Sequence, residues 1–140
     1  MAKLYFRYGA MNSGKSTALM QVAHNYEEQG MRVLILKPKV DTKGSGDLVN
    51  IPVICYGLRS DFSLKGFPGS TRLLELAHTI EEMKTICTCG RKATCNCRKV
   101  NGRFVFEGEQ VAIDLENDVQ YVSMCPQCYF RERSAFYAAR

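Results

Sequence analysis

The feature that most constrains this chain is a glycine-rich stretch near its N-terminus. Residues 9–16 read GAMNSGKS and match the pattern G-x-x-x-x-G-K-[ST] at every defined position. A short strand pattern at residues 3–8 precedes the stretch, and residues 16–29 follow it with helical periodicity that ends at Gly30. A strand, a phosphate-binding turn and a helix in this order predict a P-loop and therefore a nucleotide-binding α/β protein.

Each part of the motif has an expected role. Backbone N–H groups of the loop and the helix N-terminus would surround the phosphates of a nucleotide such as ATP. Lys15 would contact the β- and γ-phosphates, and the Ser16 hydroxyl would bind Mg²⁺. A chance glycine-rich turn is the alternative, but it explains neither the complete motif nor its context. The candidate ATP-binding residues are Gly9, Ala10, Met11, Asn12, Ser13, Gly14, Lys15 and Ser16.

Two further apolar runs, residues 32–37 and 51–56, have the pattern of strands that are buried on both faces of a parallel sheet. Residues 73–83 have a helical pattern. The polar stretch between the two runs is short, whereas a parallel crossover normally takes a dozen or more residues and usually contains a helix. The sequence therefore indicates that a connecting segment is absent between these runs.

The chain has seven cysteines, most of them between residues 87 and 128. Two close pairs, Cys87-x-Cys89 and Cys125-x-x-Cys128, flank a strand-rich stretch, which predicts a structural Zn²⁺ site with four thiolate ligands. Redox-active cysteines are the alternative, although no thioredoxin-like context surrounds them. A further C-x-C pair, Cys95 and Cys97, could compete for the metal, but we expect incidental thiols there. Cys55 lies in an apolar strand pattern and is expected to be a small buried hydrophobe.

From residue 85 onward the sequence changes to cysteines, glycines and short strand patterns at residues 103–106, 109–113 and 120–124. We place a domain boundary near Lys84. The expected fold is therefore α/β, with a P-loop parallel-sheet domain (1–84) and a small zinc-ribbon-like second domain (85–140).

Charge and hydropathy narrow the function classes. The net charge of +5 suits an anionic ligand, but the lysines and arginines are scattered and form no basic-aromatic stripe, which argues against nucleic acid. The longest apolar run is too short to span a membrane, and residues 1–3 lack the apolar core of a signal peptide. The expected location is the cytoplasm, with no membrane partner.

Six stretches in the chain carry a closer resemblance: MAKLYFRYGAMNSGKST, LKPKVDTK, IPVICYGLRSDF, KTICTCGRKA, GEQV and YVSMCPQCY. In this order they resemble the cellular-type thymidine kinases of bacteria, over most of the chain. The resemblance implies transfer of the ATP γ-phosphate to the 5′-hydroxyl of deoxythymidine, with Mg²⁺ and Zn²⁺ as cofactors. It also implies a lasso-like loop that closes over the thymine base, and a homotetramer.

The resemblance assigns residues one by one. Residues 9–16 match the ATP phosphate site, and Asp41 matches the acidic residue of the family's K-P-x-x-D-x-R stretch, although Lys43 replaces its arginine. Phe62, Phe67 and Tyr121 match aromatic residues of the thymidine pocket, where a flat apolar wall suits a base. From the residues alone, core packing is the favoured explanation of these three aromatics, and only the resemblance points to a thymidine pocket. The zinc positions fall on Cys87, Cys89, Cys125 and Cys128.

Two departures from the family pattern bear on catalysis. The family carries a strand ending in D-E-x-Q before the IPVICYG stretch, whose Asp helps to hold Mg²⁺ and whose Glu is the proposed base, and no such motif is present here. Asp61 and Asp114 have the wrong context, and the pair Glu81-Glu82 lies in a helical pattern. The lasso's usual glycine pair is replaced by residues 114–118 (DLEND). The catalytic base is therefore unknown.

Three functions remain open from the sequence. The leading one is a thymidine kinase, and the second is a non-catalytic nucleotide-binding zinc protein, which the absent Asp-Glu segment favours. The third is a zinc-ribbon nucleic-acid binder, which the scattered basic residues disfavour. An excerpt with a segment removed, an engineered minimal chain and a natural deletion all fit the missing stretch.

Overall fold

The computed structural model describes residues 2–36, 52–110 and 117–140 of the chain. Its first part is a parallel sheet of three strands, β1 (Leu4–Tyr8), β2 (Val53–Gly57) and β3 (Thr79–Glu82), in the order β2-β1-β3. Both neighbours run parallel to β1, with Leu4 opposite Val53 and Tyr5 opposite Thr79. Phe6, in the middle of β1, is completely buried. The predicted α/β class with a parallel sheet is confirmed.

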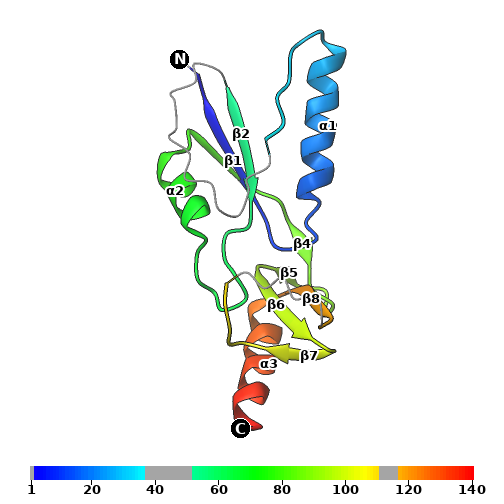
Figure 1. Ribbon diagram of the computed structural model, residues 1–140, viewed down its shortest axis with the longest axis vertical. Helices are drawn as coiled ribbons and strands as arrows, with labels where there is room; N and C mark the ends of the chain where they lie inside the picture. Colours follow the sequence, from blue (N-terminus) through cyan, green and yellow to red (C-terminus); the bar gives the residue numbers. More distant parts are fainter. Residues whose placement is uncertain (1, 37–51, 111–116) are drawn as a thin grey trace.

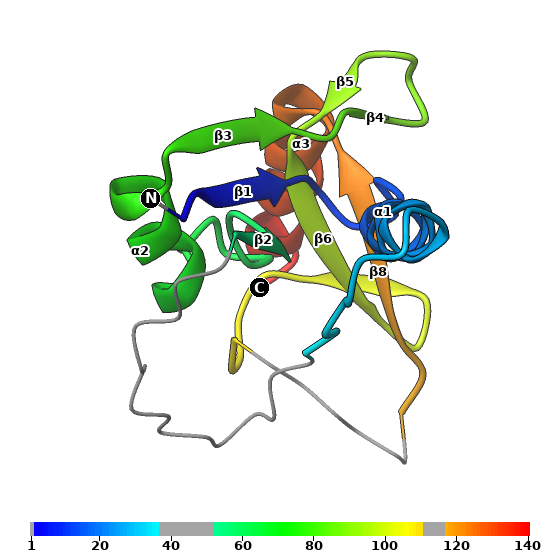
Figure 2. The same ribbon diagram turned by 90° about the horizontal axis from the view of Figure 1, so that it is seen from above.

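Two helices flank this sheet. Helix α1 (Lys15–Glu28) follows the glycine-rich loop, and α2 (Pro68–Leu76) follows β2. They lie on opposite sides of the sheet (Figures 1 and 2). Gly14 precedes α1 with a left-handed φ of 79°, which favours glycine, and Pro68 opens α2 at a position that needs no N–H donor.

The second part lies below the sheet in Figure 1 and ends at the C-terminus. A long strand, β6, lies between two antiparallel neighbours in the order β7-β6-β8, and a two-stranded ribbon of β4 and β5 precedes it. The last strand leads directly into the C-terminal helix. The elements are β4 (Thr85–Ile86), β5 (Lys92–Ala93), β6 (Cys95–Val100), β7 (Arg103–Val105), β8 (Val119–Met124) and α3 (Pro126–Ala138).

The larger buried cluster lies in this second part and combines the cysteines with Phe106 and Tyr129. The two rings meet edge to face at 5.3 Å, a favourable aromatic geometry. The Tyr129 hydroxyl donates a hydrogen bond of 2.7 Å to the carbonyl of Phe62, in the loop that follows β2. Burial raises the pKa of Tyr129 to about 12, so the hydroxyl keeps its proton at neutral pH. This bond joins the two parts of the molecule.

The prediction of a buried strand at residues 32–37 is wrong for the described residues 32–36. They form no strand, and Leu34 and Leu36 are 75% and 78% exposed. A strand needs a neighbour for its backbone N–H and C=O groups. Within the described parts of the chain, β2 is paired only with β1, so its other edge offers no bridging strand to residues 32–36. Lys37 lies outside the described residues.

The helix predicted over residues 73–83 is confirmed for residues 73–76 and wrong for residues 77–83. Helix α2 begins five residues earlier and stops at Leu76, where Ala77 turns to an extended conformation. Residues Thr79–Glu82 then form β3 beside β1, so Glu81 and Glu82 lie on a strand. Pairing with β1 outweighs the local helical pattern, because each paired residue gains sheet hydrogen bonds that the pattern does not report.

The other predicted elements agree with the structure where they can be compared. The stretches at 3–8, 16–29, 51–56, 103–106 and 120–124 correspond to β1, α1, β2, β7 and β8. The strand expected at 109–113 is absent at Glu109 and Gln110, and its remainder lies outside the described residues.

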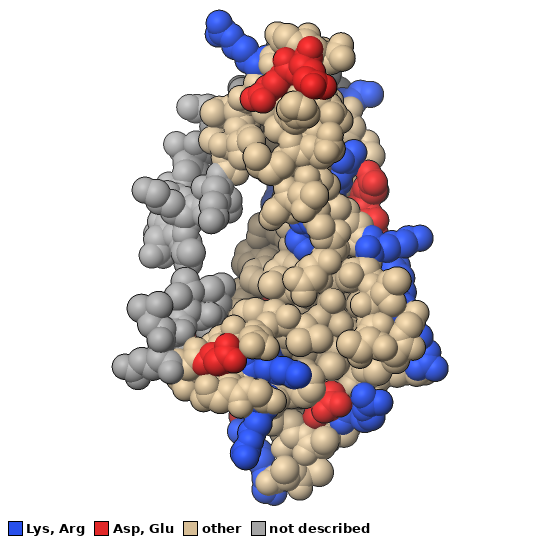
Figure 3. Space-filling view, turned by 90° about the vertical axis from the view of Figure 1, so that its right-hand side faces the viewer, with Lys and Arg blue, Asp and Glu red and all other residues tan. Residues whose placement is uncertain are grey.

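The distribution of charge and the length of the helices can be stated for the described residues. On the face shown in Figure 3, basic and acidic side chains of the described residues are interspersed, with no continuous basic stripe. No helix in the described parts is long and apolar enough to cross a membrane.

We expect Tyr129→Phe to lower the free energy of unfolding by about 1–2 kcal/mol, because the buried carbonyl of Phe62 loses its donor. Urea denaturation measures the change. Tyr137→Phe is the matched control, since Tyr137 lies on the same helix and is 40% exposed. An equal loss in both variants would contradict a specific role for the Tyr129 bond.

Candidate functional site

The glycine-rich loop lies at the carboxyl edge of the parallel sheet, between β1 and α1. The Lys15 ammonium is folded back onto the loop, where it donates to the carbonyls of Gly9 (3.0 Å) and Ala10 (2.6 Å) and to the Ser13 hydroxyl (3.0 Å). Burial lowers the pKa of Lys15. The lysine therefore lies inside the loop, where a bound phosphate would compete with these neutral acceptors as a stronger, charged one.

Gly9 is required by its neighbours. A Cβ atom at this position would lie 2.6 Å from the backbone carbonyl of Met83, just after β3, and 2.4 Å from the Ser13 hydroxyl. Backbone cannot move away as a flexible side chain can, so the loop turns here only with glycine.

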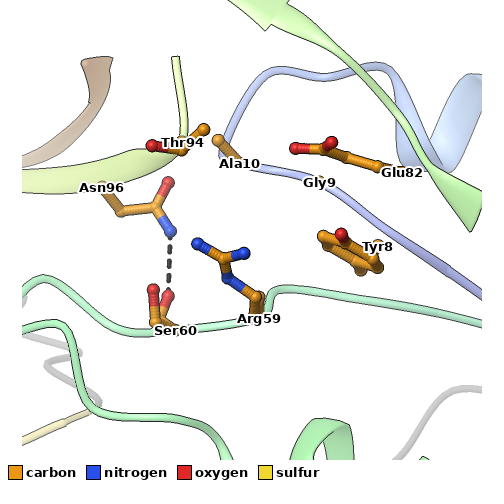
Figure 4. Close-up of a pocket in the computed structure, with 8 residues that line it drawn as sticks. All are labelled: Tyr8, Gly9, Ala10, Arg59, Ser60, Glu82, Thr94 and Asn96. Carbon is orange, nitrogen blue, oxygen red and sulfur yellow. Dashed lines mark hydrogen bonds between the residues drawn. The ribbon is translucent and has the colours of Figure 1, made fainter. Parts of the chain in front are cut away.

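A small pocket opens beside the loop, and Figure 4 shows its lining. The Arg59 guanidinium points into it from the loop after β2, beneath Ala10, and the carboxylate of Glu82 enters from the end of β3. Lys92 donates to that carboxylate at 2.5 Å. The lining residues are Tyr8, Gly9, Ala10, Arg59, Ser60, Glu82, Thr94 and Asn96.

Asn96 is a site residue that the sequence reasoning missed. It lies on β6, is 3% exposed, and accepts a hydrogen bond of 2.8 Å from the backbone N–H of Met11 in the glycine-rich loop. Its amide also donates to the carbonyl of Ser60 at 2.9 Å. No local pattern marks an asparagine in a short strand as the partner of a loop 85 residues away.

The structure brings two of the three predicted nucleoside residues together. Phe62 is 1% exposed, and the guanidinium of Arg98 lies 3.7 Å from the centre of its ring. The same guanidinium donates to the Tyr121 hydroxyl at 3.0 Å and to the carbonyl of Gln110 at 3.0 Å. Phe67 is half-buried and precedes α2. Arg98, which the sequence reasoning also missed, thus connects Phe62 with Tyr121.

Asp61 stabilises a turn. Its carboxylate accepts hydrogen bonds from the N–H and hydroxyl of Ser63, from the N–H of Lys65 and from the side chain of Gln110. Burial acts to raise the pKa of Asp61, but these hydrogen bonds outweigh burial and hold it below its ordinary value. This fits the expectation that Asp61 has the wrong context for catalysis. Asp41, Lys43 and Asp114 lie outside the described residues.

The four predicted zinc cysteines converge at one place. The sulfur atoms of Cys87, Cys89, Cys125 and Cys128 lie within 4.8 Å of one another, and Cys89 and Cys125 approach to 3.5 Å. Tetrahedral zinc with Zn–S bonds of about 2.3 Å places its ligand sulfurs about 3.8 Å apart, so a small adjustment would close the site. Burial acts to raise the pKa of Cys87, but backbone N–H groups and the neighbouring thiols lower it to about 6. The donor set and its spacing fit Zn²⁺.

The other cysteines have different surroundings. Cys97 is fully buried and donates to the sulfur of Met124 at 3.3 Å, and burial raises its pKa to about 12. Burial also raises the pKa of Cys95 on the same strand. These two are neutral thiols of the core. Cys55 is half-buried in β2, less than its apolar pattern predicts.

A loop of P-loop pattern lies at the edge of a parallel sheet and is joined to a part that gathers four cysteines able to hold a metal ion. This combination is that of a P-loop nucleotide-binding protein with a candidate metal site. A thymidine kinase family profile matches residues 2–50 and 45–129. The chain belongs to the thymidine kinase family.

Curated relatives agree with this assignment. The chain is 37% identical to a thymidine kinase of Chromobacterium violaceum, over 94% of this chain and the whole of the relative. It is 35% identical to a thymidine kinase of Lactococcus lactis, over 94% of this chain and 98% of the relative. A thymidine kinase of Idiomarina loihiensis is 38% identical, over 89% of this chain and 94% of the relative.

The comparisons also confirm that an internal segment is missing relative to the family. The alignment with the Chromobacterium relative runs over 186 positions, although this chain has only 140 residues. The family profile matches in two stretches that meet at residues 45–50. The relatives therefore carry an internal stretch with no counterpart here, at the place where the sequence predicts a missing crossover.

We expect one zinc per chain, lost in Cys125→Ser and in Cys128→Ser, because each change removes a thiolate ligand. Metal analysis of freshly purified protein measures the content. Cys55→Ser is the control and should keep its zinc. Unchanged zinc in both ligand variants would contradict this ligand set and direct attention to Cys95 and Cys97.

Proposed function

We propose that this protein is an ATP-dependent thymidine kinase, which transfers the γ-phosphate of ATP to the 5′-hydroxyl of deoxythymidine. The observation that carries the proposal is the complete phosphate loop with Lys15 turned into it, in a chain of the thymidine kinase family. The names of the curated relatives support the substrate. Phosphoryl transfer depends mainly on positioning and charge neutralisation, and a phosphate loop supplies both.

On the ATP side, residues 9–16 would hold the phosphates, and the Lys15 ammonium would exchange its carbonyl acceptors for phosphate oxygens. The Ser16 hydroxyl, at the start of α1, would be a ligand of Mg²⁺. The metal would supply charge neutralisation for the transferred phosphoryl group. Zinc has a structural role, because four cysteine ligands leave it no open position.

On the nucleoside side, Phe62, Phe67 and Tyr121 would form the thymidine pocket. The contacts of Arg98 with the Phe62 ring and the Tyr121 hydroxyl support a common location for two of them. Tyr121 is half-buried and offers a flat apolar face against which a base can stack. Phe62 is 1% exposed and lies under the Arg98 guanidinium, so it would support the pocket wall through Arg98.

Among the described residues, no carboxylate is well placed to act as the general base. Glu82 is the one acidic residue among those that line the pocket beside the loop. It accepts a hydrogen bond from Lys92, which makes it less available as a proton acceptor. The family's Asp-Glu pair lies in a motif that this sequence lacks. Loss of a positioned general base costs roughly 10²–10⁴-fold in rate.

A second candidate function is a non-catalytic nucleotide-binding zinc protein. The internal stretch that the relatives carry and this chain lacks favours it. Under both functions ATP binds at residues 9–16, so the two differ in turnover rather than in nucleotide binding.

We propose a boundary between domains 1–84 and 85–140, which coincides with the change from the parallel sheet to the antiparallel sheets. Homotetramer formation and a cytoplasmic location follow from the family resemblance.

We expect slow formation of thymidine monophosphate from ATP and deoxythymidine by the 140-residue protein. Grafting the internal stretch of the Lactococcus relative between residues 40 and 51 should raise kcat by roughly 10²–10⁴-fold, because it restores a base. Chromatography of the nucleotide product measures both rates.

Lys15→Ala in the grafted protein is the control and should abolish the gain. No product from either protein would contradict the kinase proposal. Equal turnover in both would contradict the missing-base argument and identify Glu82 as the carboxylate to test.

A further inference from the structure

The second part of the molecule, from β4 to α3, carries the four cysteines and is called the metal module below. Asn96 belongs to it, and its side chain hydrogen-bonds to the part that carries the phosphate loop. It lies on β6 between two cysteines and is almost fully buried. Its carbonyl oxygen accepts from the Met11 N–H. Its amide nitrogen donates to the Ser60 carbonyl, as Figure 4 shows. Both partners are backbone groups, one in the phosphate loop and one in the loop after β2. The side chain therefore fixes the two loops relative to each other.

The position of Asn96 depends in turn on the metal ligands. In the antiparallel pairing of β6 with β8, Asn96 lies opposite Ser123 and Cys95 lies opposite Met124. The next residue along the chain is the predicted ligand Cys125. The N–H of Thr94 donates to the Met124 carbonyl at 3.1 Å and closes the end of the ladder. A metal bound to Cys125 would therefore fix the end of β8. Because β8 is paired with β6, it would also fix the position of Asn96 on β6.

Met11 is the third residue of the phosphate loop, and its N–H group donates to Asn96. Without Asn96 this half-buried N–H would lose its acceptor, and the loop would have to rearrange or accept water. A loop that is ordered in advance loses less conformational entropy when it binds phosphates. Order in the metal module thus reaches the phosphate loop itself through the Asn96 side chain.

We propose that Asn96 is a positioning residue that couples zinc binding to nucleotide binding. Zinc orders the paired ends of β6 and β8, Asn96 transmits that order to Met11, and nucleotide binding stabilises the zinc site in return, since such coupling is reciprocal. This inference rests on the proposed nucleotide and zinc sites. It assigns the zinc module a task beyond its own stability.

The test measures the rate at which a chromogenic chelator removes zinc from the whole protein, with and without saturating Mg²⁺-ATP. In the unmodified protein we expect ATP to slow zinc loss by roughly 10-fold, within the usual range of coupling between sites. Asn96→Leu keeps the side-chain size and removes both hydrogen bonds. We expect it to abolish the slowing and to weaken ATP binding by roughly 10-fold.

Lys92→Ala is the matched control, because Lys92 also joins the metal module to the sheet, through its ion pair with Glu82 at the surface. It should retain the slowing. Equal ATP protection of zinc in Asn96→Leu and the unmodified protein would overturn the coupling alone. Absence of ATP binding by the unmodified protein would overturn the proposed nucleotide site and the coupling together.

A second measurement needs no substitution. We expect the Met11 amide to exchange its hydrogen slowly in the zinc-loaded protein without nucleotide, and to exchange faster once zinc is removed. A Met11 amide that exchanges equally fast in both states would overturn the proposal.

Discussion

The position of β1 between two parallel strands is the constraint on which the nucleotide site depends. Parallel strands end at the same edge of a sheet, so the residues that follow β1, β2 and β3 meet there. The Gly9 N–H bonds to the Gly57 carbonyl, and the Met83 N–H bonds to the Tyr8 carbonyl at 2.6 Å. These bonds fix the turn out of β1, and the Met83 carbonyl leaves space there only for glycine.

Among the described residues, the outer edge of β2 has no neighbouring strand, and this explains why residues 32–36 form no strand and stay exposed. A hydrophobic stretch at residues 32–36 is exposed beside a narrow sheet, and α1 buries only Ala23 while Met20 and Tyr26 remain exposed. The relatives carry additional internal residues at this point of the sequence. The narrow sheet and the exposed residues 32–36 thus lie next to the position at which the relatives carry these additional residues.

The parts that could be predicted from the sequence have local signals. The phosphate loop follows a strand pattern and precedes a helix pattern, and the zinc cysteines occur in two short pairs. Residues 79–82 could not be assigned, because their strand depends on pairing with β1, far away in the sequence. The strand prediction for residues 32–36 is wrong for the opposite reason. The local pattern is strong, but the described residues offer no neighbouring strand with which it could pair. Asn96 and Arg98 act through contacts that exist only after the two parts have packed together.

The nucleotide site is central to this account, and calorimetry of ATP binding tests it most directly. The unmodified protein should bind Mg²⁺-ATP, and Lys15→Ala should weaken binding at least tenfold, because a charge-assisted contact with the phosphates is lost. Lys3→Ala, an exposed lysine at the opposite end of β1, should leave the affinity unchanged. Equal ATP affinity in Lys15→Ala and the unmodified protein would contradict the assignment of residues 9–16 as the phosphate site.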